Sequence, residues 1–200
     1  IVNLATTITA TGVEQVVYDG EAGGDQLTVV ATSGNDVILH VPGAAFDEGD
    51  ILVNSLLPLR YEDLGTNGTV RVDGQAGSDE LVYRGTAGAD LFTVAGGQIV
   101  LGSRLPVLPV AVERWRLSGL GGDDTFRLTA QANVTLVVEG DEPAGSDQLL
   151  FTGSGGAVTV DLGASTIEDG GVAGSPDVVY SGVELVEIAA SGGAFTVVGT

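Results

Sequence analysis

The sequence predicts an all-β protein and, within that class, a parallel β-solenoid, in which similar coils stack and each strand pairs with its counterpart in the next coil. Three observations predict it: short β-branched segments between glycine turns, a phrase of glycine and aspartate that recurs before such segments, and the lack of helical periodicity. The phrase stands at residues 23–27, 77–81, 121–126 and 145–149. Recurrence of this kind is typical of repeat proteins, whose units are too small to bury an apolar face alone.

The strands are predicted where valine, leucine, isoleucine and threonine gather between glycine, asparagine or aspartate residues. In chain order they are residues 16–18, 27–30, 37–41, 69–72, 81–83, 91–94, 115–117, 125–128, 134–138, 158–160, 183–188 and 195–197. Residues 2–8 are also strand-like. No stretch of ten residues shows helical periodicity without an interrupting glycine or proline, so we expect almost no helix.

A second landmark indicates the length of the repeat. A pair made of an apolar residue and a glutamate recurs along the chain and ends at Glu14, Glu62, Glu113 and Glu184. The aspartates of the last two phrases, Asp124 and Asp147, stand about half as far apart as the first pairs do. We therefore expect two coils in most of these intervals, each of about 20–25 residues, a length that known repeat units also have.

The phrase also has an inner echo, which fades along the chain. The phrases of Asp25 and Asp79 are each followed, at the same short distance, by a second glycine turn with its own aspartate, Asp36 or Asp90. Further along, Ala157 and Ala194 stand where an aspartate would be expected.

Stacked coils of this length bury their apolar residues in one continuous core, and the general preference for right-handed crossovers predicts a right-handed β-helix or β-roll. Residues 42–50, 104–109, 141–144 and 167–177 are predicted to be longer loops at one edge of the stack. No linker-like stretch divides residues 1–200, so we expect one domain, a piece of a larger protein because no methionine is present. A pair of antiparallel β-sandwiches is the competing fold, but it does not explain the recurrence.

The charge of the chain excludes some partners. The 27 acidic residues outnumber the seven arginines, no lysine is present, and the net charge is −20. Nucleic acid requires clustered basic residues, and an anionic membrane surface attracts them. No apolar run reaches the roughly 18 residues of a membrane span, and no cysteine is available for disulfides. We expect no nucleic acid and no membrane insertion, whereas an acidic surface suits divalent cations.

The phrase of glycine, one residue, aspartate, one residue and an apolar residue resembles the nonapeptide repeat of the RTX, or haemolysin-type, calcium-binding family. The closest matches are residues 119–126 and 74–81. The resemblance implies a parallel β-roll that binds calcium between neighbouring turns and lies outside the cell or on its surface. True RTX repeats follow one another without a gap, whereas here each phrase stands alone in a longer coil, as in degenerate repeats of large secreted or surface bacterial proteins.

The aspartates of the phrases are the candidate calcium ligands. Calcium takes six to eight oxygen ligands, which stacked turns can supply from carboxylates and glycine carbonyls together. The candidates are Asp25, Asp79, Asp123, Asp124 and Asp147, with Asp36 and Asp90 as a second group. The alternative for each of them is an Asx-turn, in which the carboxylate binds nearby backbone N–H groups.

Other side chains are weaker candidates. His40, the single histidine, lies in an apolar segment, and we expect it to be packed or at the surface rather than a metal ligand. The alternation at Arg114, Trp115 and Arg116 predicts two arginines on one face, paired with acidic residues.

We therefore expect a non-enzymatic, extracellular structural module of a surface, adhesin or fibre-forming protein, rigidified by calcium. Its expected partners are further copies bound head to tail, other surface proteins, or glycans. The alternative is a β-helix enzyme acting on polysaccharides, a lyase or a glycosidase. A lyase needs a base beside its acidic cluster, and a glycosidase two facing carboxylates. No residue is assigned a catalytic role.

Overall fold

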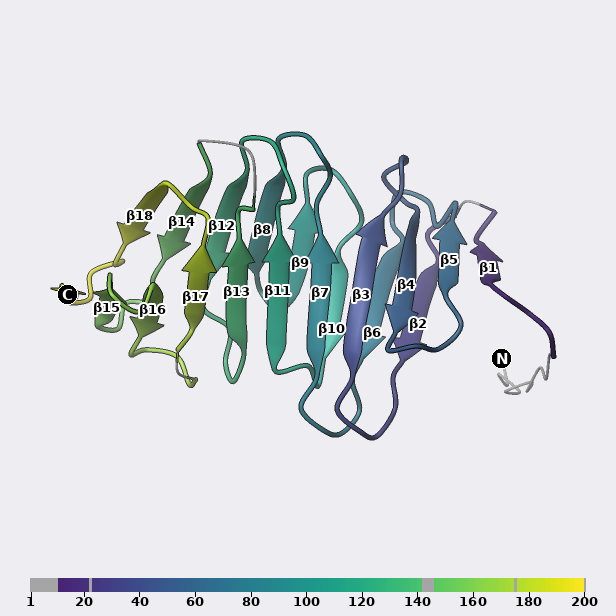
Figure 1. Ribbon diagram of the computed structural model, residues 1–200, viewed down its shortest axis with the longest axis horizontal. Coiled ribbons are helices and arrows are strands. Elements are labelled where there is room, and N and C mark those ends of the chain that lie inside the picture. Colours follow the sequence, from purple (N-terminus) through teal and green to yellow (C-terminus); the bar gives the residue numbers. More distant parts are fainter. Residues whose placement is uncertain (1–10, 22, 142–145, 175, 200) are drawn as a thin grey trace.

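The computed structural model describes residues 11–21, 23–141, 146–174 and 176–199. The predicted strand-like segment 2–8 and the predicted loop residues 142–144 lie outside this range. The all-β prediction is confirmed: in the described part of the chain, strands and turns form two sheets and no helix (Figure 1). Accordingly, none of these residues forms a helix able to cross a membrane.

The larger sheet, sheet A, has eleven strands among the described residues. In spatial order they are β1 (Val16–Asp19), β5 (Leu59–Glu62), β4 (Gly49–Val53), β3 (Val37–Pro42), β7 (Glu80–Arg84), β11 (Arg114–Ser118), β13 (Thr135–Glu139), β17 (Val178–Ser181), β16 (Thr166–Asp169), β15 (Val158–Asp161) and β19 (Phe195–Val198).

The smaller sheet, sheet B, has eight strands in the same described ranges. In spatial order from the C-terminal end they are β18 (Leu185–Ala189), β14 (Gln148–Thr152), β12 (Thr125–Thr129), β8 (Leu91–Ala95), β9 (Gln98–Leu101), β10 (Val107–Val110), β6 (Thr69–Asp73) and β2 (Gln26–Val30).

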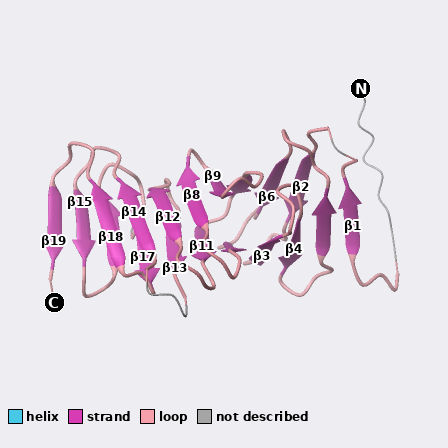
Figure 2. Cartoon of the chain, turned by 90° about the horizontal axis from the view of Figure 1, so that it is seen from above, coloured by secondary structure: helices cyan, strands magenta, loops and turns pink. Residues whose placement is uncertain are grey.

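The chain crosses repeatedly between the two sheets. It passes from β11 in sheet A to β12 in sheet B, then to β13 in sheet A and β14 in sheet B. Strands that become neighbours in this way are parallel and in register, so that Phe126 of β12 lies between Phe92 of β8 and Leu149 of β14. Figure 2 shows the strands following one another from β1 at one end to β19 at the other. Two mostly parallel sheets connected in this way are compatible with a β-solenoid.

Three antiparallel meanders interrupt the parallel order. They are β3–β4–β5 and β15–β16–β17 in sheet A, and β8–β9–β10 in sheet B. The prediction of edge loops at 42–50, 104–109 and 167–177 was therefore partly wrong, because these segments contribute to β4, β10 and β16. Each of these three strands has a buried apolar residue that faces the core: Ile51 in β4, Val107 in β10 and Ile167 in β16. The prolines and glycines around the strands had suggested loops.

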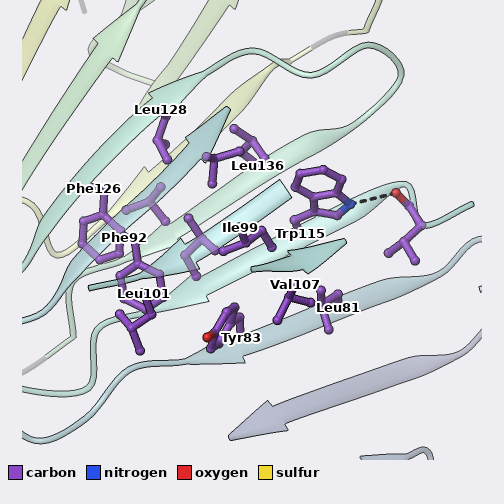
Figure 3. Packing of buried hydrophobic residues seen from close by; sticks show 14 of the residues in the cluster. Leu81, Tyr83, Phe92, Ile99, Leu101, Val107, Trp115, Phe126, Leu128 and Leu136 are labelled. Carbon is purple, nitrogen blue, oxygen red and sulfur yellow. Dashed lines mark hydrogen bonds between the residues drawn. The ribbon is translucent and has the colours of Figure 1, made fainter. Parts of the chain in front are cut away.

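The core lies between the two sheets and forms one cluster of buried apolar side chains from both (Figure 3). Tyr83 of sheet A meets Phe92 of sheet B edge to face, with ring centroids 5.9 Å apart. Phe92 in turn stacks on Phe126 of the neighbouring strand at 5.1 Å. The indole N–H of Trp115 is buried but satisfied, since it donates to the carbonyl of Val112 at 3.0 Å.

Two side-chain predictions are confirmed. Trp115 is buried, while the arginines on either side of it face outward, with Arg114 3.1 Å from Glu80 and Arg116 2.9 Å from the same carboxylate. His40 is a packed histidine. Its Nε2 lies 2.8 Å from the hydroxyl of Tyr61, and burial lowers its pKa to about 3, so the ring is neutral near pH 7.

Candidate functional site

The recurring phrase forms the corners at which the chain passes from one sheet to the other. Gly74, Gly85 and Gly119 each follow directly after a strand, and an aspartate stands five residues later, just before the next strand. We call segments of this kind aspartate corners and name each by its aspartate: Asp25, Asp36, Asp79, Asp90, Asp124 and Asp147. The corner of Asp36 begins with Ala31 instead of a glycine, and Asp147 stands seven residues after Gly140.

The corners that lead into sheet A are joined by a chain of hydrogen bonds. The backbone N–H of Asp36 donates to Oδ1 of Asp79 at 2.7 Å, and the N–H of Asp79 donates to Oε2 of Glu113 at 2.8 Å. Each carboxylate therefore accepts a backbone proton from the preceding corner. We call this arrangement the sheet A ladder.

A longer ladder joins the corners that lead into sheet B. Here the N–H of Asp90 donates to Asp124 at 2.8 Å, that of Asp124 to Asp147 at 2.7 Å, and that of Asp147 to Glu184 at 2.7 Å. Hydrogen bonds to carboxylates are about twice as strong as those between neutral groups. The sheet B ladder thus adds a row of strong contacts to the strand pairing between β8, β12, β14 and β18.

In the corners that begin with a glycine, this glycine makes room for the carboxylate. A Cβ atom added to Gly74 or Gly85 would lie 2.6 Å from Oδ2 of Asp79 or Asp90, and one on Gly119 would overlap Oδ2 of Asp124. The aspartate thus fills the space that a side chain on the glycine would occupy. The φ angle of these glycines is not in the left-handed region, so the need for glycine here is steric.

One oxygen of several ladder carboxylates is buried without a hydrogen-bond partner. These oxygens are Oδ2 of Asp79, Asp124 and Asp147. In the corners of Asp36 and Asp90 the second oxygen instead accepts the N–H of Thr32 or Thr86. Burial raises the pKa of Asp79 and Asp147 and raises that of Asp124 to about 6, because desolvation disfavours the charged form.

The structure separates the predicted ligand residues into groups. Asp36 and Asp79 belong to the sheet A ladder, and Asp90, Asp124 and Asp147 belong to the sheet B ladder. Asp123 is exposed beside Asp124.

Asp25 has a different partner. It stands in an aspartate corner, but its N–H donates to the carbonyl of Leu64 at 2.9 Å rather than to a carboxylate.

Sequence reasoning missed four carboxylates of this system. Glu113 and Glu184 end the two ladders, although the sequence indicates them only as landmarks of the repeat. Asp169 replaces the carboxylate missing at Ala157: it accepts the N–H of Ser154 at 2.6 Å, and its own N–H donates to Asp177. The first pair could have been found from the coil period. Asp169 could not, because it reaches the corner from the neighbouring antiparallel strand.

The ladder geometry supplies hydrogen-bond acceptors rather than a ready cluster of metal ligands. Across the described ranges, no group of three or more histidine, aspartate or glutamate side chains is placed to hold a metal ion. A calcium ion at a corner would therefore need backbone carbonyls for most of its oxygens. Calcium binding stays a prediction.

A shallow hollow lies beside the Asp90 end of the sheet B ladder, where the β3–β4 and β9–β10 connections meet. Phe46, Arg104 and Leu101 line one part of it, of about 230 Å³, together with Asp90. The guanidinium of Arg104 donates to the carbonyl of Ala45 at 2.6 Å and so joins the two connections. This hollow brings an acid and an arginine into one depression.

Comparison with known proteins gives no relative for the chain. No family model matches it, and neither a curated protein nor a solved structure is similar to it.

Proposed function

We propose that the chain is a β-solenoid module with a structural function: a rigid spacer within an extracellular surface, adhesin or fibre-forming protein. The observation that carries the proposal is the continuity of the two carboxylate ladders and of the core from coil to coil. Such continuity stabilises neighbouring coils against sliding and bending. It serves a module whose task is to hold other parts at a fixed distance.

Two further features support this proposal. The net charge of −20 keeps a repetitive β-protein soluble and repels like-charged neighbours. Two of the seven arginines, Arg114 and Arg116, form ion pairs along sheet A, where they share Glu80.

The rigidity of the module can be measured directly. Thr28 of β2 and Glu187 of β18 are exposed near opposite ends of sheet B, and the chain has no cysteine. Replacing both by cysteine gives unique sites for a donor and an acceptor dye. We expect a single narrow distance distribution that does not change between low and high salt. A broad or salt-dependent distribution would show a flexible chain and contradict the spacer function.

The second candidate is an enzyme acting on an acidic polysaccharide, and the hollow that holds Asp90 and Arg104 is the observation in its favour. Incubation with polygalacturonate and alginate separates the two functions, since a lyase would release unsaturated products that absorb in the far ultraviolet. We expect no product. Product formation that is lost in Arg104→Ala, and retained in the control Arg127→Ala, would establish the enzyme instead.

The proposed location is tested on cells that make the whole protein. An extracellular module must be accessible to a protease or to an antibody added to intact cells. Protection of the module until the cells are lysed would contradict this location.

A further inference from the structure

The hollow between the β3–β4 and β9–β10 connections has a second part, which is larger than the first. This part has a volume of about 470 Å³ and adjoins the first across Phe46, Ser103 and Arg104, which line both. Its lining is completed by Thr66, Leu105 and Pro106. The volume falls within the roughly 300–1,000 Å³ of known ligand sites. The two parts therefore form one depression that is large enough for a small ligand.

Hydrogen bonds hold the walls of the hollow together. The backbone N–H of Leu105 donates to the carbonyl of Phe46 at 3.0 Å, and that of Arg104 donates to the carbonyl of Leu101 at 2.9 Å. The guanidinium of Arg104 donates to the carbonyl of Ala45 at 2.6 Å. Because these bonds join the two connections within the chain itself, the hollow is formed before any ligand binds.

The guanidinium of Arg104 has donors to spare. Acidic residues outnumber arginines by 27 to seven in this chain, and yet Arg104 forms no ion pair with any residue that the structure describes. Only the bond to Ala45 uses one of its N–H groups. An arginine with free donors matches a carboxylate, which it binds through two parallel hydrogen bonds.

The other walls offer an aromatic ring and free hydroxyl groups. Phe46 is 38% exposed, whereas Phe92 and Phe126 are buried in the core. Ser103 and Thr66 are exposed, and neither hydroxyl bonds to another described residue. A hydroxyl both donates and accepts, and an aromatic ring gives a flat apolar surface. This combination suits a sugar, which has hydroxyls at its rim and an apolar C–H face.

The two parts of the hollow differ in charge. Asp90 lines the first part, and one oxygen of its carboxylate accepts the N–H of Thr86 at 2.5 Å. The second part has no acidic residue in its lining. A carboxylate on the ligand is therefore favoured in the second part beside Arg104, since like charges repel in the first. A neutral unit suits the first part, where Asp90 accepts hydroxyl groups.

We propose that the hollow is a binding site for a glycan in which a uronic acid adjoins a neutral sugar. The carboxylate of the uronic acid lies on Arg104 in the second part, and the sugar packs on Phe46. A polymer with a charge on every unit fits less well, because Asp90 and the net charge of −20 repel it. The inference goes beyond the spacer function, since a rigid module can carry such a site or lack it.

The C-terminus of a peptide would also bring a carboxylate next to apolar groups. The free hydroxyls of Ser103 and Thr66 and the acceptor at Asp90 favour the sugar instead. A sugar has several hydroxyls that can bond to all of these groups at once, whereas a peptide end has few donors to offer them. The peptide end is therefore one arm of the test.

The test follows the amide signals of the isotope-labelled 200-residue chain by nuclear magnetic resonance. The probe is cellobiouronic acid, in which glucuronic acid is linked to glucose, and we expect saturable shifts at residues 44–46 and 102–106. Cellobiose, with a hydroxymethyl group in place of the carboxylate, should bind about tenfold more weakly or less, because it loses hydrogen bonds to a charged group. Digalacturonate and N-acetylphenylalanine, which stand for a fully charged glycan and a peptide end, should also bind more weakly.

Three variants locate the binding, and each makes the net charge more negative by one. Arg104→Gln keeps a donor for Ala45 but cannot bind a carboxylate through two charged bonds, and it should weaken binding about tenfold. Ser103→Glu should weaken binding as strongly, because it places a charge in the wall shared by both parts. Since Ser103 is exposed, this change removes no buried contact. Arg127→Gln, exposed on β12, is the control and should leave the affinity unchanged.

Several results would overturn the proposal. Equal affinities of the three variants, or shifts confined to residues outside the hollow, would place the site elsewhere. Equal or tighter binding of cellobiose or of digalacturonate would contradict the assignment of one charged and one neutral unit. Tighter binding of N-acetylphenylalanine would assign the hollow to a peptide end, and release of glucose from the probe would assign it to the enzyme. The dye-distance measurement tests the spacer function independently of all these results.

Discussion

The backbone N–H of Asp124 donates to Oδ1 of Asp147, one corner further along the chain, at 2.7 Å. The same contact recurs between Asp36 and Asp79 and between Asp90 and Asp124. A short sequence phrase is thus converted into a periodic contact, because Asp79, Asp124 and Asp147 each accept the N–H of one corner aspartate and donate their own N–H to the next carboxylate. The corners therefore support the register of neighbouring strands in addition to the strand pairing.

The fit between glycine and carboxylate predicts a steric penalty for Gly119→Ala. The added methyl group would overlap Oδ2 of Asp124 and lie 2.9 Å from the carbonyl of Gly140. Overpacking of this kind costs about 1–3 kcal/mol, which lowers the melting temperature by roughly 2–12 °C in a domain of this size. Gly88→Ala is the control, since its Cβ would meet only Thr86 Oγ1 at 3.9 Å. Equal melting temperatures for the two variants would show that the carboxylate moves aside at little cost.

Burial of the ladder carboxyls predicts a protein that is more stable in mild acid than at neutral pH. The pKa of Asp124 is raised to about 6 in the folded chain, whereas an unfolded aspartate has a pKa near 3.9. The folded state therefore binds this proton more tightly. Its contribution to stability is fully present below about pH 4 and is lost as the pH rises through about 6.

Melting curves between pH 4 and 7.5 check this prediction. Loss of repulsion among the other carboxylates acts in the same direction, so the assignment needs a variant. Asp124→Asn keeps an acceptor for the N–H of Asp90 but cannot ionise, and it should flatten the curve around pH 6. Asp123→Asn removes the same charge at the exposed neighbouring position and should leave the curve unchanged in shape. If the melting temperature of Asp124→Asn changes with pH as steeply as that of the native chain, the effect arises from general charge repulsion.

Much of the fold can be predicted from local sequence. Segments such as 69–72 and 125–128 alternate regularly between polar and apolar side chains and follow a glycine turn, and they form β6 and β12. Six strands of the meanders were missed, because glycine and proline near them suggested loops and their partners are set by tertiary pairing: β4, β5, β9, β10, β16 and β17. The phrase located the corners. It could not show that Glu113 and Glu184 receive their hydrogen bonds, since those residues lie 34 and 37 positions away from their donors.

Calcium binding at the corners predicts a stabilisation that depends on calcium concentration. An ion that binds only the native state stabilises it in proportion to the logarithm of ligand excess, so millimolar calcium should raise the melting temperature by several degrees above that in a chelator. Asp123 is exposed beside the sheet B ladder, where its carboxylate can reach an ion from solution. Asp123→Asn should therefore reduce the calcium effect. An unchanged melting temperature at millimolar calcium would show that the corner carboxylates serve only as hydrogen-bond acceptors in the turns and ladders.

The replacement of one carboxylate by another predicts a rescue experiment at the corner that precedes β15. Asp169 accepts the N–H of Ser154 at 2.6 Å, its hydroxyl at 2.9 Å and the N–H of Gly171 at 3.0 Å. Asp169→Ala removes these three hydrogen bonds to a buried carboxylate, and each hydrogen bond to a charged group contributes about 1.5–3 kcal/mol to stability. We expect a clear fall in the urea midpoint.

The rescue experiment places an aspartate at position 157, where the recurring phrase of glycine and aspartate lacks one. Ala157 stands directly before β15, as Asp36 stands directly before β3, and the two sheet A meanders follow the same order of strands. In the double variant Asp169→Ala with Ala157→Asp, a corner carboxylate is again available to the N–H of Ser154, so part of the lost midpoint should return. Ala194→Asp, before β19, is the control in the same Asp169→Ala background and should give no recovery. Recovery from both aspartates alike would point to a general charge effect, and recovery from neither would show that Asp169 does more than replace a corner aspartate.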